Sequence, residues 1–221
     1  MKRFYLSVLF LCSFGSLFAG GPSFAFCDYS QGKVFIQENG EIVWEHKAPD
    51  SNDIWVLPNK NILFTAGKEV LEVSRKNDTI FHYTSESNIF ACQRLKNGNT
   101  FIGECDNGRL LEVSPDGSIV KDVSILPFGV KTGGHAFMRN ARCLDNGHYL
   151  VAHYGGKSVV EYDENGKAVW NIPISGGAHS VIRLPSGNTL VAVTDKDNNP
   201  GVFEYDMAGN IVWSLTNKDL P

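Results

Sequence analysis

The sequence predicts an all-β fold, a β-propeller built from four-stranded antiparallel blades. The first observation behind this prediction is a unit of four short apolar runs between Gly176 and Trp213, separated by turn sequences. Each run has the length and the β-branched or aromatic composition of a strand. The second observation is that the same order of signals recurs upstream at a period of roughly 40 residues, which is typical of propeller blades.

Two turn signals set the positions of the blades. The first precedes the outermost strand, where each copy offers Gly or Asn for a left-handed backbone position. Its copies are at Gly40, Asn77, Gly117, Gly166 and Gly209. The second is the hairpin between the first two strands, with copies at Asn59, Asn97-Gly98, Asn146-Gly147 and Ser186-Gly187. The second signal has one copy fewer, which predicts a first blade without its innermost strand.

The blades follow in order along the chain. Three strands of a first blade, with the sequences FAFCDY, KVFIQ and EIVWEH, precede four complete blades. The complete blades are expected near residues 52–83, 90–122, 136–172 and 178–215. Propellers usually close by pairing strands from the two ends of the chain, because an unpaired edge invites aggregation. We therefore expect a truncated six-bladed propeller, whose complete version continues past Pro221.

The N-terminus predicts export. Lys2 and Arg3 precede an apolar run that ends at Ala19 and is followed by small residues, which indicates a secretory signal peptide and not a membrane span. We expect the signal peptide within residues 1–25, with cleavage after Gly21 or after Ala25, and the propeller domain over residues 26–221. The protein is then secreted or periplasmic, with no membrane span in its mature form.

Composition indicates which binding partners to expect and how many cysteines could form disulfides. The chain has 221 residues and a net charge of -4, and no basic run that would follow a phosphate backbone, so nucleic acid is excluded as a partner. Cys27, Cys92, Cys105 and Cys143 remain in the mature chain. Disulfides and buried thiols both stay open. In the hairpin at Asn97-Gly98, Cys92 is expected opposite Gly103. Cys105 is then only diagonal to Cys92, so a disulfide between the two is possible but geometrically unfavourable.

Two of the repeated motifs resemble a known family. The GNIVW motif at Gly209–Trp213 and the RLPSGNTL motif at Arg183–Leu190 are similar to motifs of exported bacterial proteins with PQQ-like β-propeller repeats. The resemblance covers essentially the whole mature chain, and it implies a closed propeller of six blades. It implies no particular function, because one propeller fold carries many unrelated sites.

The loop lengths indicate which face of the propeller carries a site. Strand direction places the long segments 124–137 and 193–201 on one face and the tight hairpin turns on the other. Binding residues tend to lie on loops above a rigid scaffold, so the candidate site is on the face with the long segments. Asp195, Asp197 and Asn199 resemble the start of a calcium loop, but the glycine comes one position late and the bidentate Glu is absent. We expect no metal and no cofactor.

Candidate ligand contacts near the channel on this face come from the starts of inner strands and the ends of second strands. They are His135, His179, Arg139, Arg142, Glu104 and His153. Counting back five positions from the leucine before each hairpin gives equivalent inner positions, which are Asn52, Phe90, Arg139 and His179. Because these four residues differ in chemistry, the inner ring is not symmetric, which is typical of a functional site.

Two functions stay open. The first is a binding protein, not an enzyme, that recognises a small molecule, a glycan or a protein at the channel mouth. The second is group transfer of the arylsulfotransferase type, whose repeats this sequence resembles. There His135 or His179 would act as nucleophile, and Arg139 and Arg142 would clamp the anion. Quinone-dependent dehydrogenase chemistry is disfavoured, because the resemblance would imply adjacent cysteines and the sequence has none.

Overall fold

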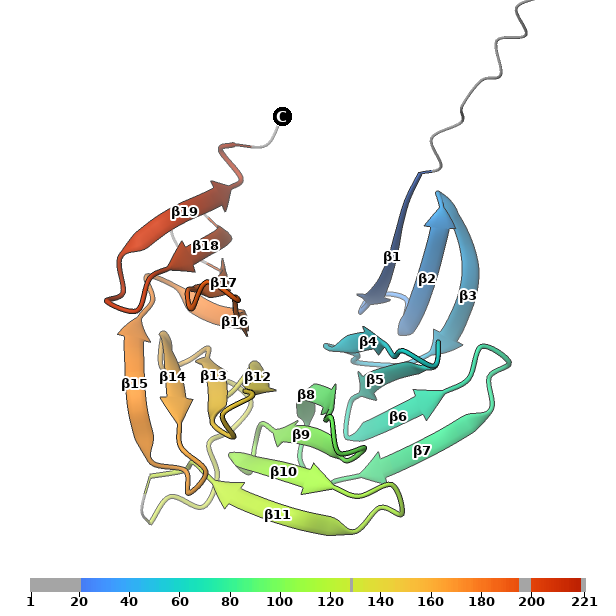
Figure 1. The fold of residues 1–221 in the computed structure, drawn as a ribbon, viewed down its shortest axis with the longest axis horizontal. Coiled ribbons are helices and arrows are strands. Elements are labelled where there is room, and N and C mark those ends of the chain that lie inside the picture. The colour runs from blue at the N-terminus through green and yellow to red at the C-terminus, as the bar shows by residue number, and fades with distance from the viewer. Residues whose placement is uncertain (1–20, 128, 195–199, 220–221) are drawn as a thin grey trace, which may run out of the picture.

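Five antiparallel sheets form the protein and follow one another around a common axis (Figure 1). The computed structural model describes residues 21–127, 129–194 and 200–219. Blade I has three strands, β1 (Gly21–Asp28), β2 (Lys33–Asn39) and β3 (Glu41–Lys47). Blade II has four, β4 (Ile54–Val56), β5 (Ile62–Ala66), β6 (Glu69–Val73) and β7 (Thr79–Thr84).

The remaining blades have four strands each. Blade III consists of β8 (Ile89–Arg94), β9 (Thr100–Glu104), β10 (Arg109–Val113) and β11 (Ile119–Ser124). Blade IV consists of β12 (Asn140–Cys143), β13 (Tyr149–His153), β14 (Ser158–Tyr162) and β15 (Ala168–Pro173). Blade V consists of β16 (Gly177–Arg183), β17 (Thr189–Thr194), β18 (Gly201–Tyr205) and β19 (Ile211–Thr216). The first strand of each of these blades lies nearest the axis and the last lies at the periphery (Figure 1).

The predicted propeller is confirmed, but the predicted blade number is wrong. The structure has five blades of three or four strands, not a truncated propeller of six. The sixth blade was inferred from the missing inner strand of blade I and from the family resemblance, not from residues of the chain. Blade I is held without a fourth strand, because β1 contacts β4 and because Val34, Ile36 and Trp44 pack in a core shared with blade II.

The turn residues adopt the backbone conformation that the sequence predicts. All five positions before the outermost strands are left-handed, with φ of 88° at Gly40, 67° at Asn77, 87° at Gly117, 81° at Gly166 and 85° at Gly209. The hairpin glycines Gly98, Gly147 and Gly187 are left-handed as well, and in blade II Lys60 takes this conformation. The repeat is therefore specified by its turns.

The predicted pairing of Cys92 with Gly103 is wrong by one residue. Cys92 pairs with Ile102, because the connection is a five-residue loop and not a two-residue turn at Asn97-Gly98. In this loop the N–H of Leu95 donates to Asn99 and the N–H of Gly98 donates to Leu95. The four cysteines of the described residues, Cys27, Cys92, Cys105 and Cys143, are all free thiols.

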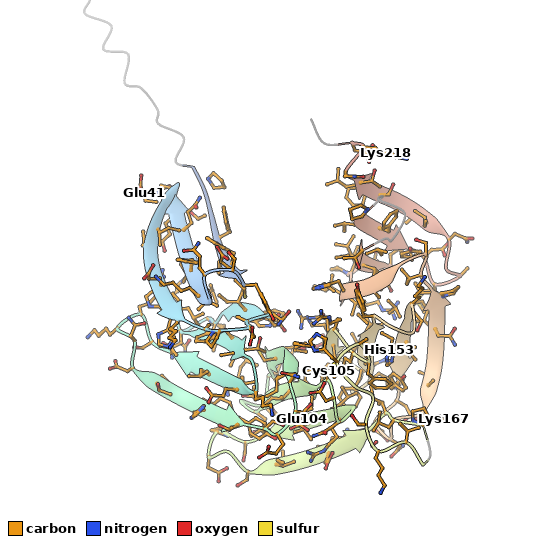
Figure 2. The ribbon with its side chains drawn as sticks, turned by 180° about the vertical axis from the view of Figure 1, so that it is seen from behind. Glu41, Glu104, Cys105, His153, Lys167 and Lys218 are labelled. Atoms are coloured by element: carbon orange, nitrogen blue, oxygen red, sulfur yellow. The ribbon has the colours of Figure 1, made fainter. Side chains whose placement is uncertain are left out.

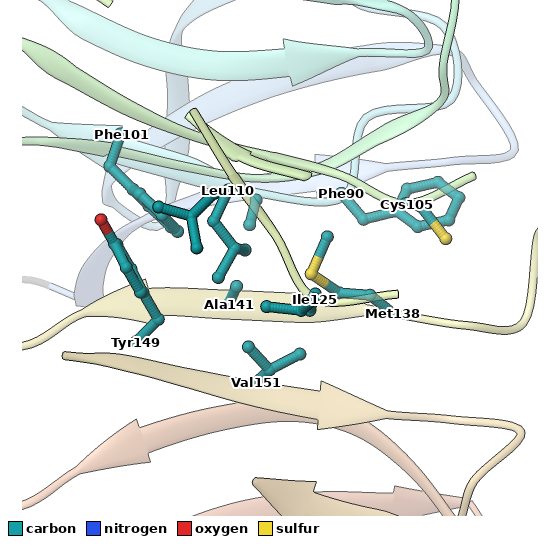
Figure 3. Packing of buried hydrophobic residues seen from close by; sticks show 11 residues of the cluster. Phe90, Phe101, Cys105, Leu110, Ile125, Met138, Ala141, Tyr149 and Val151 are labelled. Carbon is teal, nitrogen blue, oxygen red and sulfur yellow. The ribbon is translucent and has the colours of Figure 1, made fainter. Parts of the chain in front are cut away.

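The hydrophobic core consists of four clusters, one at each junction between consecutive blades. Figure 3 shows the cluster between blades III and IV, where Phe101 stacks on Tyr149 with ring centroids 5.6 Å apart. Leu110 and Met138 are fully buried in the same cluster. Burial of one such side chain stabilises the fold by roughly 1.5–3 kcal/mol. Each blade thus gains stability mainly from its neighbours.

A glutamate recurs on the third strand of each complete blade, and in blades II and IV it reinforces the junction with the next blade. Glu72 accepts hydrogen bonds from Asn61 of its own hairpin and from Arg94 of blade III. Glu161 likewise accepts one from Arg183 of blade V, with Nη2 and Oε2 2.7 Å apart. These contacts give Glu72 and Glu161 a structural role at the blade junctions.

Blades I and V each have one sheet face on which no other blade packs within the described residues (Figure 1). The exposure of equivalent side chains reflects this, since Trp213 of blade V is 48% exposed and Trp44 of blade I, which faces blade II, is 7% exposed. No helix of the described ranges has the length and apolar character needed to cross a membrane.

Candidate functional site

An irregularity recurs at one position of the inner strands. The pairing of β8 with β9 skips Phe90, and the pairing of β16 with β17 skips His179. In blade IV the N–H of Arg139 donates to the carbonyl of Ala152, the residue that already pairs with Asn140. Such bulges leave a residue outside the regular ladder and change the direction of its side chain. Phe90, Arg139 and His179, which the sequence places at equivalent positions of the repeat, therefore also occupy equivalent positions in the structure.

A cavity of about 430 Å³, which we name the axial pocket, lies beside these positions. Blades I, IV and V and the linker between blades I and II contribute its walls. The lining residues are Cys27, Tyr29, Ser51, Asn52, Arg139 and His179. Its volume falls within the range of sites for small molecules.

Arg139 is the charged residue of the axial pocket, and within the described residues its guanidinium has no acidic partner. The guanidinium carbon lies 4.7 Å from the ring centre of Phe90 and 5.5 Å from that of Tyr154. The Nε atom is buried without a hydrogen-bond partner. The other arginines of the described residues each pair with a carboxylate. Arg139 alone among them keeps an uncompensated positive charge.

His179 also lines the axial pocket, close enough to Arg139 for the charge of the guanidinium to act on its ring. Its half-buried ring meets the Tyr154 ring edge to face, with centroids 6.2 Å apart. Burial lowers the pKa of His179, and the positive charge of Arg139 lowers it further. His179 is therefore neutral at pH 7, and Arg139 supplies the positive charge of the pocket.

Arg142, also predicted as a ligand contact, is engaged elsewhere. Its guanidinium forms a bidentate ion pair with Asp53, with N–O distances of 2.6 and 2.9 Å. The backbone N–H of Cys92 donates to the same carboxylate, and the Trp55 ring lies 5.1 Å from the guanidinium carbon. Burial raises the pKa of the Asp53 carboxyl, and the charge of Arg142 opposes this rise. The pair connects blades II, III and IV.

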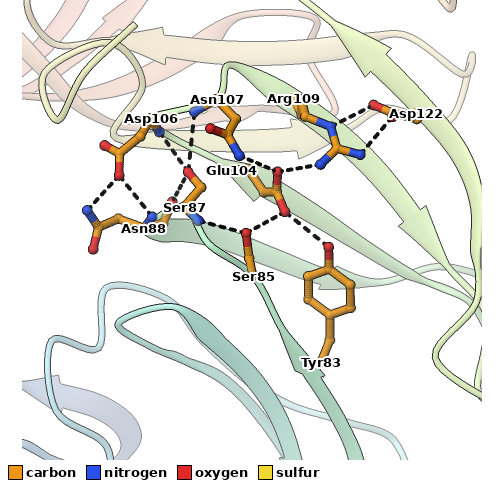
Figure 4. Close-up of polar contacts among 9 residues, drawn as sticks. All are labelled: Tyr83, Ser85, Ser87, Asn88, Glu104, Asp106, Asn107, Arg109 and Asp122. Atoms are coloured by element: carbon orange, nitrogen blue, oxygen red, sulfur yellow. Dashed lines mark hydrogen bonds and ion pairs between the residues drawn. The ribbon is translucent and has the colours of Figure 1, made fainter. Parts of the chain in front are cut away.

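Glu104 lies in a buried network that joins blades II and III (Figures 2 and 4). Its side chain is 1% exposed. It accepts hydrogen bonds from the hydroxyls of Tyr83 and Ser85 at 3.0 and 2.6 Å. Asn107 and Arg109 donate to its other oxygen at 3.3 and 3.0 Å. This carboxylate is fully engaged in holding two blades together and does not line the axial pocket.

His153 is buried in blade IV and holds the segment before β12 in place (Figure 2). Its Nδ1 lies 2.8 Å from the carbonyl oxygen of Phe137, and its Nε2 lies 2.8 Å from the hydroxyl of Tyr162. Because the carbonyl only accepts, Nδ1 donates to it and Nε2 accepts from Tyr162. Burial lowers the pKa of His153 and raises the pKa of Tyr162 to about 12.

His135 lies next to the axial pocket but does not line it. Its exposed ring meets Phe90 edge to face at 5.3 Å, and Phe90 in turn contacts Arg139. Of the predicted site residues, the structure thus brings Arg139 and His179 together. Arg142, Glu104 and His153 lie in other contacts.

Four site residues escaped the sequence-based prediction, and two of them carry a recognisable signal. Tyr29 lies in the turn between β1 and β2, and Tyr154 lies in the turn between β13 and β14. These turns belong to the same class, second strand to third strand, as segment 193–201, and therefore to the same face. Cys27 and Ser51 have no distinguishing signal.

The predicted acidic loop with Asp195, Asp197 and Asn199 lies outside the described residues. Within the ranges that the structure describes, His, Cys, Asp and Glu side chains form no group of three or more arranged to hold a metal ion.

A larger cavity of about 710 Å³ lies on the face with the hairpin turns. Its lining includes Trp55, Ile182 and Met207, together with Arg142 and Arg183. Both of these arginines are paired, Arg142 with Asp53 and Arg183 with Glu161. This cavity is larger but offers no uncompensated arginine, so the axial pocket is the better candidate site.

Comparisons with known proteins agree on the fold alone. No family model matches the chain, so the PQQ-like repeat is not confirmed. No curated protein matches it either. A solved protein of unknown function from Bacteroides caccae superposes with a TM-score of 0.76 at 22% identity, covering 88% of this chain and 73% of the other.

Two lyase structures also share the fold. A streptogramin B lyase superposes with a TM-score of 0.61 at 17% identity, over 87% of this chain and 64% of the other. An inactive virginiamycin B lyase from Staphylococcus aureus with quinupristin gives 0.58 at 14%, over 88% and 73%. At these identities the similarity establishes a propeller and transfers no residue role.

Proposed function

We propose that this chain is an exported β-propeller that binds a small molecule, or one end of a glycan, in the axial pocket. The observation that carries the proposal is the uncompensated guanidinium of Arg139 in a cavity of about 430 Å³. Pockets with a few convergent polar groups are the usual binding sites of such ligands. A concave site of this size suits them better than the broad surface of a protein partner.

Of two further considerations, the first supports small-molecule binding and the second weighs against group transfer. One structural neighbour, the virginiamycin B lyase, contains quinupristin, so a propeller of this type holds a small molecule in at least one case. The arylsulfotransferase-type alternative uses Arg139 and Arg142 together as an anion clamp beside His135 or His179. Arg142 is bound to Asp53, and among the arginines that the structure describes Arg139 alone lines the axial pocket.

Export is part of the proposal, and the position of β1 favours one of the two cleavage sites. β1 begins at Gly21, and Phe24 and Ala25 pair with Gln37 and Ile36 of β2. Cleavage after Ala25 would remove the pairs that Gly21, Phe24 and Ala25 form with β2, whereas cleavage after Gly21 would remove only the pair of Gly21 with Asn39. N-terminal sequencing of the exported protein should therefore give Pro22 as the first residue. A protein retained in the cytoplasm with Met1 would contradict export.

Ligand-observed NMR with a library of neutral and charged aromatic fragments tests the binding site. The wild-type protein is compared with Asn52→Phe, which places a ring in the axial pocket, and with Lys96→Phe, an equal change on an exposed turn of the opposite face. We expect fragments that bind the wild type and Lys96→Phe but not Asn52→Phe. Fragments that bind all three proteins equally would place binding elsewhere and refute the proposal.

A further inference from the structure

The surroundings of Arg139 are specific enough to indicate the chemical class of the ligand. Two aromatic rings contact the guanidinium, and Nε is buried without a partner. The terminal Nη groups are therefore the part of the side chain that is left to meet a ligand. Two parallel N–H donors match the two oxygens of a carboxylate.

We propose that the axial pocket takes a small organic monocarboxylate, whose carboxylate is held end-on by Arg139 and whose body lies against the remaining pocket walls. This inference rests on the proposed function. Tyr29 and His179 offer rings to an apolar or aromatic body, and Asn52 offers an amide to a polar substituent.

The charge of the pocket favours an anion with a single charge. Arg139 contributes one positive charge, and no other lining side chain among the described residues is ionised at pH 7. His179 is neutral there, burial raises the pKa of the Cys27 thiol, and the neighbouring Asp50 carboxylate raises the pKa of the Tyr29 hydroxyl. A doubly charged phosphate would leave one negative charge without a partner in a partly desolvated site, which is costly. A carboxylate compensates Arg139 fully.

The contrast with the other arginines supports a ligand role for this one. Five arginines of the described residues pair with carboxylates of the chain itself. A partly buried guanidinium without such a partner loses hydration without compensation. Groups placed at this cost often mark functional sites. An incoming carboxylate would supply the missing partner.

Isothermal titration calorimetry with matched acids and amides tests the inference. The probes are benzoate against benzamide and indole-3-acetate against indole-3-acetamide, with benzenesulfonate and phenyl phosphate as alternative anions. The wild type should bind each acid at least about tenfold more tightly than its amide, since a charge-assisted bidentate contact is worth at least that factor. The two alternative anions should bind more weakly than benzoate.

Substitutions at three positions test whether Arg139 causes the preference for acids over amides. Arg139→Met should abolish the preference for the acid, and Arg139→Lys should keep only part of it, because an ammonium lacks the planar pair of donors. Asn52→Asp places a competing carboxylate in the pocket and should weaken the acids more than the amides. Arg75→Gln, a change at an arginine paired with Glu38 outside the pocket, should leave all affinities unchanged.

The outcomes separate the inference from the proposed function. Equal affinities for acids and amides, or tighter binding of the sulfonate or phosphate, would overturn the carboxylate inference and leave binding in the axial pocket intact. If no fragment or probe binds in the axial pocket, the proposed function fails, and the inference fails with it.

Discussion

Arg139 and Arg142 lie three residues apart at the inner strand of blade IV, yet their surroundings are opposite. Arg142 is clamped by the buried carboxylate of Asp53 and covered by Trp55. Arg139 meets aromatic rings and an open cavity, and no carboxylate of the described ranges pairs with it. Identical side chains on one segment thus divide into a structural group and a ligand group. The two arginines differ in whether a carboxylate from another blade lies beside the guanidinium.

The two faces of the propeller repeat this contrast. On the face with the hairpin turns, glutamates such as Glu72 and Glu161 bind the turn and the next blade, so the polar groups there are paired. On the face with the axial pocket, the turns after the second strands bring Tyr29 and Tyr154 toward Arg139. Substitutions on the hairpin face should therefore lower the stability of the fold, and substitutions on the face with the axial pocket should weaken ligand binding.

The largest effect is expected from Asp53→Asn, which removes the charge of the carboxylate without changing its shape. Arg142 would then carry an uncompensated charge in a buried site, which costs about 3–5 kcal/mol. For a chain of this size that loss corresponds to a fall in Tm on the order of 10 °C. Differential scanning calorimetry of the purified protein measures it.

Arg139→Met is the matched control for Asp53→Asn, because it removes a charge from the same region without breaking an ion pair. Its Tm should stay close to that of the wild type, and only the affinity for carboxylates should change. A loss of stability in Arg139→Met equal to that in Asp53→Asn would show that Arg139 is also structural, and the distinction between the two arginines would fail.

The second prediction concerns Gly177→Ala at the start of β16. A Cβ atom at this position would overlap the ring of Tyr154, and Tyr154 contacts Arg139. We expect a loss of about 1–3 kcal/mol from overpacking, together with weaker binding of benzoate as the ring moves. Chemical denaturation and calorimetric titration measure the two effects.

Gly156→Ala is the control, because there the added Cβ would lie 3.3 Å from the Cβ of His153, outside the axial pocket. It should leave benzoate affinity unchanged. If Gly177→Ala also leaves it unchanged, Tyr154 is not needed to position Arg139, and the account of the pocket must be revised.

Much of the fold follows from local sequence. The left-handed turns at Gly40, Asn77 and their equivalents mark every blade, because few residues tolerate that backbone conformation. The blade number did not follow in the same way. The absent strand of blade I suggested a sixth blade, but packing between blades I and II buries the core of blade I without that strand. The number of blades depends on packing between whole sheets, and no short sequence motif predicts it.

The sequence predicts where the candidate site lies, but not which side chains pair with its charged and polar residues. The bulged inner positions, the choice of face, and Arg139 and His179 all follow from counting along the repeat. That Arg142 pairs with Asp53 does not, because the two residues are 89 positions apart and lie on different blades. Glu104 and His153 also occupy the predicted strand ends, yet their partners Tyr83 and Tyr162 come from other strands.

The third prediction concerns the pH dependence of binding. The ring of Tyr154 contacts His179, and Cys27 and Tyr29 line the same pocket. Burial and the charge of Arg139 lower the pKa of His179. A bound carboxylate favours the protonated ring, so it raises that pKa, and binding is accompanied by proton uptake. The affinity for benzoate should therefore increase as the pH falls from 7 to 5.5, by a factor of about three to ten.

His179→Gln should remove this pH dependence while the acid remains preferred over the amide, because Arg139 is unchanged. Titrations at several pH values measure both quantities. An affinity that falls with the pH, or a pH dependence that persists in His179→Gln, would assign the titration to another group and weaken the link between His179 and the ligand.

The smallest effect is expected from Lys96→Gln, which breaks an ion pair with Asp145 on the hairpin face. The distance of 2.8 Å is as short as that of a buried pair, but both side chains are 86% exposed. Water and salt screen such a pair, and holding two long side chains in place costs entropy. Tm should therefore change by less than about 2 °C. A fall as large as that of Asp53→Asn would mean that pairing itself, and not burial, determines which charges on this face hold the blades together.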